Sequence, residues 1–121
     1  MSKRILVVED HEDNRQILRD LLASAGYDML EAENGEAGVA AATAEKPDLI
    51  LMDIQLPILD GYEATRRIKA DPALKAIPII VVTSYALSGD EDKARAAGCD
   101  AYVAKPYSPR QLLARIKEFL H

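Results

Sequence analysis

Short apolar runs alternate with segments of helical periodicity along this chain. The segments that suit strands cover residues 5–8, 28–32, 48–52, 77–82 and 101–104, and all but the second, which also carries charge, are mainly apolar. The helical segments cover residues 12–25, 36–44, 60–71, 88–98 and 108–120. Strands separated by helices favour right-handed crossovers, which produce a parallel sheet with helices on both faces. At 121 residues the chain has the length of one domain, so we predict a doubly wound α/β fold over residues 1–121.

The second strand and the helix ends carry more specific signals. Asp28 and Glu31 place charge in the second strand, as expected at an exposed edge of the sheet. The expected helix caps are Asn34, Ser88 with Glu91, Ser108 with Gln111, and the C-terminal glycines Gly26 and Gly98.

Two of the expected helices differ in the apolar face that they offer to the core. The inward face of the first consists of Ile17, Leu18, Leu21, Leu22 and Ala25. Asn14 and Arg15 are therefore expected to be solvated. The helix over 88–98 offers only alanines to the core, so we expect it to be weakly anchored and mobile.

Composition and charge exclude several classes of protein. The chain has 15 Lys and Arg against 20 Asp and Glu, a net charge of −5 that is spread along its length, so direct nucleic-acid binding is not expected. The longest apolar run is far shorter than the about 20 residues that span a bilayer, and the N-terminus does not resemble a signal peptide. The single cysteine, Cys99, is expected to be a small buried residue. We therefore expect a cytoplasmic protein that does not insert into membranes.

Polar and charged residues follow four of the five expected strands. Glu9 and Asp10 follow the first strand, Asp53 the third, Thr83 the fourth and Lys105 the fifth. In open parallel sheets, ligands bind beyond the carboxyl ends of the strands. We therefore expect these side chains to form one site.

Three carboxylates in one site repel one another. At an effective dielectric constant of 20, two such charges 4 Å apart cost about 4 kcal/mol, and one lysine cannot neutralise three. Mg²⁺ binds one or two carboxylates and takes further ligands from water and substrate phosphate. The predicted Mg²⁺ ligands are Glu9, Asp10, Asp53 and the carbonyl group of Gln55. Phosphoryl transfer then needs a nucleophile, Asp53, and groups that bind phosphoryl oxygens, Lys105 and Thr83.

Four segments of the chain resemble the CheY-like receiver domains of two-component response regulators. In the family's order they are ILVVEDHEDNR, DLILMDIQLPILDGYE, PIIVVTSYA and AAGCDAYVAKPYSPRQLL. The resemblance implies a flavodoxin-like (CheY-like) five-stranded sheet of order 2-1-3-4-5. It also implies that Asp53 accepts a phosphoryl group from a phosphohistidine, and that Glu9 and Asp10 form the acidic pair of a Mg²⁺ site.

The resemblance implies a switch and partners as well. Thr83 and Tyr102 are expected to move together on phosphorylation, and the Lys105–Pro106 peptide bond is expected to be cis. The implied phosphodonor is a sensor histidine kinase or a histidine phosphotransferase. A downstream effector would bind the surface of the fourth helix, the fifth strand and the last helix. The chain looks like the stand-alone receivers of the DivK type, although the receivers of hybrid kinases are similar in sequence.

Other residues near the acceptor aspartate are expected to tune the site. Gln55 and Tyr85 flank the path of the hydrolytic water in receivers, and the bulk of Tyr85 predicts slow autodephosphorylation, over minutes or longer. We therefore expect a phosphoacceptor signalling protein and not a turnover enzyme. Gly61 is expected to adopt an unusual backbone angle near Asp53, and His11 is expected to be solvated.

Three alternatives remain open from the sequence. A flavodoxin shares the topology, but the acidic loop after the first strand would repel a flavin phosphate. A haloacid-dehalogenase-type phosphatase also has an aspartate after a strand, but it usually carries a second aspartate two residues later, where this chain has Gln55. A receiver-like scaffold that binds partners without phosphate is the third alternative.

Overall fold

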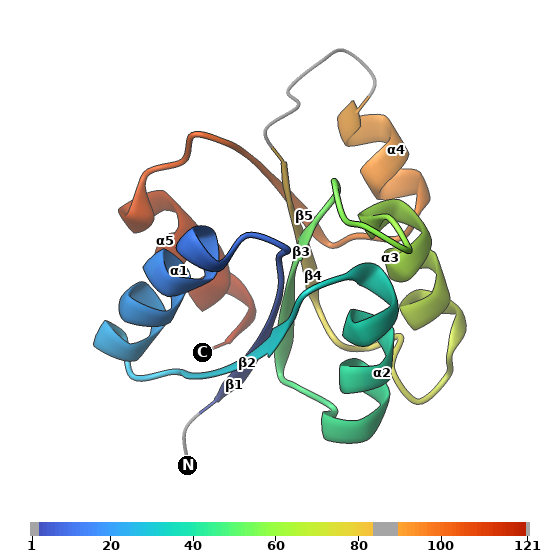
Figure 1. Ribbon diagram of the computed structural model, residues 1–121, viewed down its shortest axis with the longest axis horizontal. Coiled ribbons are helices and arrows are strands. Elements are labelled where there is room, and N and C mark those ends of the chain that lie inside the picture. Colours follow the sequence, from blue (N-terminus) through green and yellow to red (C-terminus); the bar gives the residue numbers. More distant parts are fainter. Residues whose placement is uncertain (1–2, 84–89, 121) are drawn as a thin grey trace.

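The computed structural model describes residues 3–83 and 90–120, which form a parallel five-stranded sheet with helices on both faces (Figure 1). The strands are β1 (Arg4–Val8), β2 (Asp28–Ala32), β3 (Leu49–Asp53), β4 (Ile79–Thr83) and β5 (Ala101–Ala104). The helices are α1 (Glu12–Ser24), α2 (Gly35–Glu45), α3 (Gly61–Ala70), α4 (Asp90–Ala96) and α5 (Pro109–Phe119). The strand order β2-β1-β3-β4-β5 confirms the predicted fold class.

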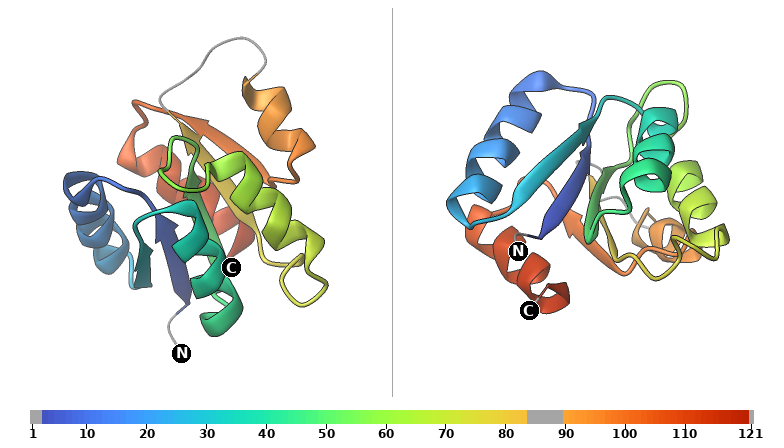
Figure 2. Two further views of the ribbon diagram at one scale, coloured as in Figure 1. Left: turned by 45° about the vertical axis from the view of Figure 1, so that its right-hand side comes forward. Right: turned by 90° about the horizontal axis from the view of Figure 1, so that it is seen from below.

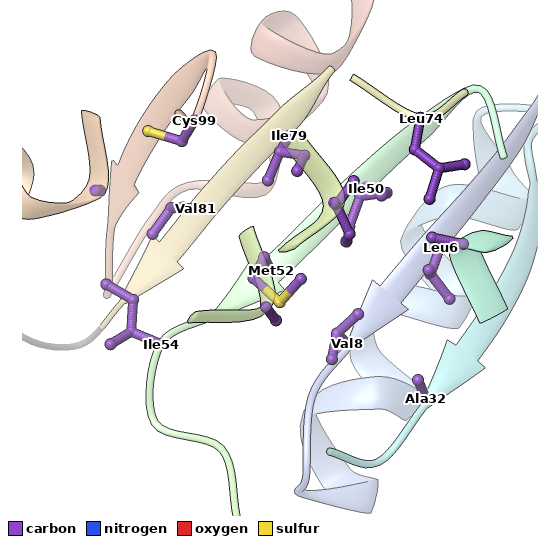
Figure 3. Close-up of a cluster of buried hydrophobic side chains, with 14 residues drawn as sticks. Leu6, Val8, Ala32, Ile50, Met52, Ile54, Leu74, Ile79, Val81 and Cys99 are labelled. Carbon is purple, nitrogen blue, oxygen red and sulfur yellow. The ribbon is translucent and has the colours of Figure 1, made fainter. Parts of the chain in front are cut away.

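Helices α1 and α5 cover one face of the sheet, and α2, α3 and α4 cover the other (Figures 1 and 2). Successive side chains of a strand point to opposite faces, so each central strand supplies both layers of the core. On the α1 and α5 side, Ile5, Leu51 and Ile80 are buried in one apolar cluster. On the other side, Leu6 and Ile50 belong to a second cluster (Figure 3).

Several local predictions are confirmed. β2 pairs only with β1 among the described strands and so forms an edge of the sheet. The side chain of Asn34 accepts a hydrogen bond from the amide of Ala37 at 2.7 Å. Ser108 and Gln111 form the predicted capping box. Gly26 and Gly98 have left-handed backbone angles, with φ of 86° and 106°.

Helix α4 has the small apolar face that its sequence predicts. Ala94 and Ala97 are buried, at 0% and 4% exposure. Neither offers a large side chain to the core, so the expectation of weak anchoring stands as a prediction. Ser88, the expected cap of this helix, lies outside the described residues.

Two strands begin and end later than expected. Because Pro78 lacks the amide that a sheet requires, β4 begins at Ile79. Asp53 and Thr83 are the last residues of β3 and β4, where they pair in register with Val82 and Ala104. The two polar residues are therefore held by the sheet itself.

The orientation of α1 differs from the expected one. Ile17 is 59% exposed, whereas Arg15 is only 7% exposed, so the predictions of a buried Ile17 and a solvated Arg15 are wrong. The physical reason is that the guanidinium group of Arg15 turns back towards the loop after β1, where Nη1 donates to the carbonyl oxygen of Glu9 at 2.7 Å.

None of the helices among the described residues combines the length and the hydropathy that a membrane span needs.

Candidate functional site

Four predicted site residues, Glu9, Asp53, Thr83 and Lys105, lie at the carboxyl edge of the sheet. The strands point upwards to this edge in Figure 1. Asp53 and Thr83 end β3 and β4, and Glu9 and Lys105 directly follow β1 and β5. The Glu9, Asp53 and Thr83 residues are all buried. A buried glutamate, aspartate and threonine at one end of an apolar sheet require polar partners.

Lys105 joins the two buried carboxylates. Its Nζ lies 3.1 Å from Oε1 of Glu9 and 3.5 Å from Oδ2 of Asp53. The backbone amide of Lys105 donates to the carbonyl oxygen of Thr83 at 2.6 Å, which fixes the start of this lysine's loop against β4. Burial alone would lower the pKa of Lys105, but the charges of Asp53 and Glu9 outweigh it and raise that pKa.

The carboxylate of Glu9 accepts hydrogen bonds from several donors. Besides Lys105, the amide of His11 donates to its Oε2 at 3.2 Å and Nδ2 of Asn14 donates to its Oε1 at 3.2 Å. Burial would raise the pKa of Glu9, but the His11 amide and then Lys105 lower it to about 2. Glu9 is therefore ionised at neutral pH.

The carboxylate of Asp53 has the opposite balance. Its Oδ1 accepts a hydrogen bond from the amide of Gln55 at 3.3 Å. Burial and then the negative charge of Glu9 raise the pKa of Asp53 to about 6, although Lys105 opposes the shift. Without a further cation, the site is thus short of positive charge around Asp53.

Asp10 supplies a further carboxylate beside Glu9. Oxygens of Glu9 and Asp10 and a ring nitrogen of His11 lie within 4.8 Å of one another. Oδ1 of Asp10 is buried and accepts no hydrogen bond from any described residue, and Nδ1 of His11 lies 3.1 Å from it. A buried carboxylate oxygen without a hydrogen-bond donor, next to the carboxylate of Glu9, fits a hard divalent cation, and Mg²⁺ prefers the oxygens to the histidine nitrogen. The His11 side chain is 70% exposed, in agreement with the expected solvation.

Gly61 is needed beside Asp53 for a reason other than the expected one. Its backbone lies outside the left-handed region, so the prediction of an unusual backbone angle is wrong. A side chain at this position would instead overlap the carbonyl oxygen of Asp53. The amide of Gly61 also donates to the carbonyl oxygen of Ile54 at 2.9 Å. The start of α3 therefore rests directly on the backbone of the candidate acceptor.

A cavity of about 250 Å³ opens beside the three linked residues, between α1 and the loop that follows β5. Its polar wall is formed by Glu9, Asn14, Asp53 and Lys105, and its apolar wall includes Leu18, Leu51, Val82 and Tyr107. The sequence analysis did not single out Tyr107, whose pKa is raised by burial. Its position directly after Lys105-Pro106 is the signal that could have identified it.

The other predicted site residues have different positions. The Lys105–Pro106 peptide bond is cis. Gln55 is exposed, and Tyr102 lines a separate hollow on β5 and α5 together with Tyr107. Tyr85, the predicted rate-tuning residue, lies outside the described residues.

Comparisons with known proteins agree with this geometry. Residues 5–117 match the family model of the response regulator receiver domain. The chain is 43% identical over 120 residues to the polar-differentiation response regulator DivK of Brucella anthropi, covering 99% of this chain and 98% of that protein.

Two solved structures show the same fold. The receiver domain of the sensor histidine kinase PA1611 from Pseudomonas aeruginosa PAO1 has a TM-score of 0.92 and 37% identity, covers 99% of this chain and 98% of its own, and has a magnesium ion coordinated in its active-site cleft. The chemotaxis protein CheY4 of Vibrio cholerae has a TM-score of 0.91 and 25% identity, with 98% of this chain and 99% of its own covered. With the sheet order and the family match, these similarities show that the chain belongs to the response regulator receiver domain family.

Proposed function

We propose that this protein is a phosphoacceptor of two-component or phosphorelay signalling, in which Asp53 receives a phosphoryl group from a phosphohistidine. The observation that supports this most directly is the Asp53 carboxylate, buried at the end of β3 and contacted by Lys105 at 3.5 Å. An oxygen of Asp53 attacks phosphorus, the bond from phosphorus to the histidine nitrogen breaks, and the nitrogen keeps the bonding electrons. The donor is a sensor histidine kinase or a histidine phosphotransferase.

The reaction depends on Mg²⁺, for which this chain has a suitable set of oxygen ligands. Glu9, Asp10 and Asp53 would hold the ion through their carboxylates, with the carbonyl of Gln55 as a further ligand. The buried Oδ1 of Asp10, which accepts no hydrogen bond from the described residues, and the charge deficit around Asp53 support this assignment. When bound, the ion neutralises negative charge that gathers on the phosphoryl oxygens.

Lys105 and Thr83 bind the transferred group. The ammonium group of Lys105 already lies between Glu9 and Asp53, and its raised pKa keeps it charged at neutral pH. Phosphorylation adds about 1.5 to 2 negative charges and three acceptor oxygens at Asp53. Lys105 then turns from Glu9 and Asp53 towards the new oxygens, and the hydroxyl of Thr83, at the end of the neighbouring strand, donates to one of them.

The movement of Thr83 is coupled to Tyr102 and to α4. Space vacated by Thr83 admits the ring of Tyr102, which is only partly buried against the core. Helix α4 shifts with it because its alanine face holds it weakly. The surface of α4, β5 and α5 thereby changes its affinity for an effector, as a population shift between two existing states.

The proposal extends to the whole chain and its setting. Residues 1–121 act as one receiver domain in the cytoplasm. The phosphorylated form lasts minutes or longer, as the bulky residue type at position 85 predicts from the sequence. The protein promotes its own phosphorylation and slow dephosphorylation without turning over a separate substrate.

Incubation with a small phosphodonor, acetyl phosphate, and Mg²⁺ tests the acceptor directly. Intact-mass spectrometry should show one added phosphoryl group on the wild type and none on Asp53→Asn. When Mg²⁺ is left out and EDTA is added, the wild type should gain no phosphoryl group. Phosphorylation of Asp53→Asn to the wild-type extent would refute the assignment of the acceptor. Release of many equivalents of phosphate within seconds, faster than the proposed autodephosphorylation, would favour a phosphatase.

A further inference from the structure

Arg15 is a buried cation outside the cluster of acceptor residues. It lies in the first turn of α1 and is 7% exposed. Its Nη1 donates to the carbonyl oxygen of Glu9 at 2.7 Å, a fully buried hydrogen bond. Its other guanidinium nitrogens face carboxylates, with Nε 3.2 Å from Glu31 and Nη2 2.5 Å from Glu12.

The surrounding charges explain why this guanidinium stays in a buried position. A buried cation is costly unless it is paired and hydrogen-bonded. Glu12 and Glu31 supply pairing, and Glu33 adds a third carboxylate at 3.7 Å from Nη2. The planar guanidinium can satisfy these acceptors and a carbonyl group at the same time, because its five donors point in fixed directions.

The carbonyl group that Arg15 holds belongs to the acidic pair. The amide of Glu9 donates to the carbonyl oxygen of Ala32 at 3.0 Å, so both backbone polar groups of Glu9 are anchored. The amide of Arg15 also donates to the carbonyl oxygen of His11 at 3.1 Å. One residue of α1 thus holds the loop from Glu9 to His11 through both its backbone and its side chain.

The peptide group between Glu9 and Asp10 sets the directions of both carboxylates. Rotation of that peptide would break the hydrogen bond to Arg15 and would redirect the buried Oδ1 of Asp10. Groups that orient metal ligands affect metal affinity even when they do not touch the metal.

We infer that Arg15 is a positioning residue that holds Glu9 and Asp10 in the orientation required for Mg²⁺ binding. This inference rests on the proposed function, because it takes Glu9 and Asp10 as Mg²⁺ ligands. It assigns no contact between Arg15 and the ion or the phosphoryl group.

Arg19 provides a matched control on the same helix. It pairs with the same two glutamates, at 2.6 Å from Glu31 and 3.4 Å from Glu12. Its side-chain hydrogen bonds are with Glu31, Glu12 and Gln16, whereas the Glu9 carbonyl group is bound by Arg15. Substitution of Arg19 therefore removes contacts to the same two glutamates but keeps the hydrogen bond between Arg15 and the Glu9 carbonyl group.

Isothermal titration calorimetry of the full chain with MgCl₂, at constant ionic strength, measures the affinity for Mg²⁺. Urea unfolding of each variant in EDTA measures its stability. Arg15→Met should weaken Mg²⁺ binding by about 10- to 100-fold, the range found for groups that orient metal ligands. Arg19→Met should change it less than about two-fold, because the variant keeps the Glu9 hydrogen bond. Arg15→Lys should lie between Arg15→Met and the wild type, since an ammonium group can donate to the Glu9 carbonyl but cannot also pair with both glutamates.

The outcomes separate the inference from the proposed function. If the wild type does not bind Mg²⁺, the proposed function fails and the inference fails with it. If the wild type binds Mg²⁺ and Arg15→Met binds it equally well, only the inference is overturned. It is also overturned if Arg15 and Arg19 variants lose affinity in proportion to their loss of stability. Should Arg15→Met not fold, Arg15→Lys against Arg19→Lys decides, and equal affinities refute the inference.

Discussion

Replacement of Asp53 by asparagine should stabilise the metal-free protein at alkaline pH. The pKa of Asp53 is raised from 3.8 to about 6 in the folded protein, so the folded state binds the proton more tightly than the unfolded state does. Stability from this residue is present at low pH and is lost as pH rises from about 4 to 6. A shift of about two units, at 1.36 kcal/mol per unit, corresponds to about 3 kcal/mol above pH 6.

Asparagine has nearly the shape of aspartate and no charge to desolvate. Lys105 keeps its partner Glu9 at 3.1 Å in the variant, so the lysine is not left unpaired. The free energy of unfolding of Asp53→Asn in EDTA should therefore exceed that of the wild type at pH 8, by up to about 3 kcal/mol. The difference should shrink towards zero as the pH falls to about 4.

Urea unfolding followed by circular dichroism at several pH values measures this difference. Comparison of the variant with the wild type at each pH removes the titration of all other groups. Addition of MgCl₂ should stabilise the wild type more than the variant, since the ion relieves the same repulsion. A variant that is less stable than the wild type at pH 8, or a stability difference that does not vary with pH, would show that burial and Glu9 do not destabilise the Asp53 carboxylate.

Three further substitutions have defined expectations. Gly61→Ala should lower the free energy of unfolding by about 2 kcal/mol or more and should slow phosphorylation, because the methyl group overlaps the carbonyl oxygen of Asp53; urea unfolding and intact mass measure the two effects, and an unchanged stability would contradict the overlap. Ile58→Gly should raise the free energy of unfolding by up to about 1 kcal/mol, since Ile58 is 75% exposed and has φ of 70°; a thermal melt with a lower midpoint would argue against backbone strain there. Ser108→Ala should cost about 1 kcal/mol through loss of its hydrogen bond with the amide of Gln111 at 3.1 Å, whereas Ser24→Ala, which lies outside any N-cap, should be close to neutral in the same urea assay.

The sheet and the strand-end residues could be predicted because their signals are local. Four of the strands are mainly apolar segments, and the polar residues at or after their ends reach the same edge in any parallel sheet. The helix caps at Asn34 and Ser108 depend on side chains only three residues from the amides that they bind. Such features hardly depend on how distant elements meet.

The orientation of α1 could not be predicted from its periodicity. Helical spacing places Ile17 and Leu18 on one side of the helix, but the buried position of Arg15 depends on the carbonyl group of Glu9 and on Glu31 of another strand. The role of Gly61 depends in the same way on the backbone of a different element, β3. Contacts of this kind arise only when the elements are assembled.

The placement of Asp53 and Thr83 inside β3 and β4 has a consequence for the durability of the site. These are central strands of the sheet, so their hydrogen bonds break mainly when the entire domain opens. The proposed shift of α4 would therefore leave the backbone of the candidate acceptor and of Thr83 in place. The proposed chemistry and the proposed signalling surface thus lie on different parts of the molecule, so that one could change without unfolding the other.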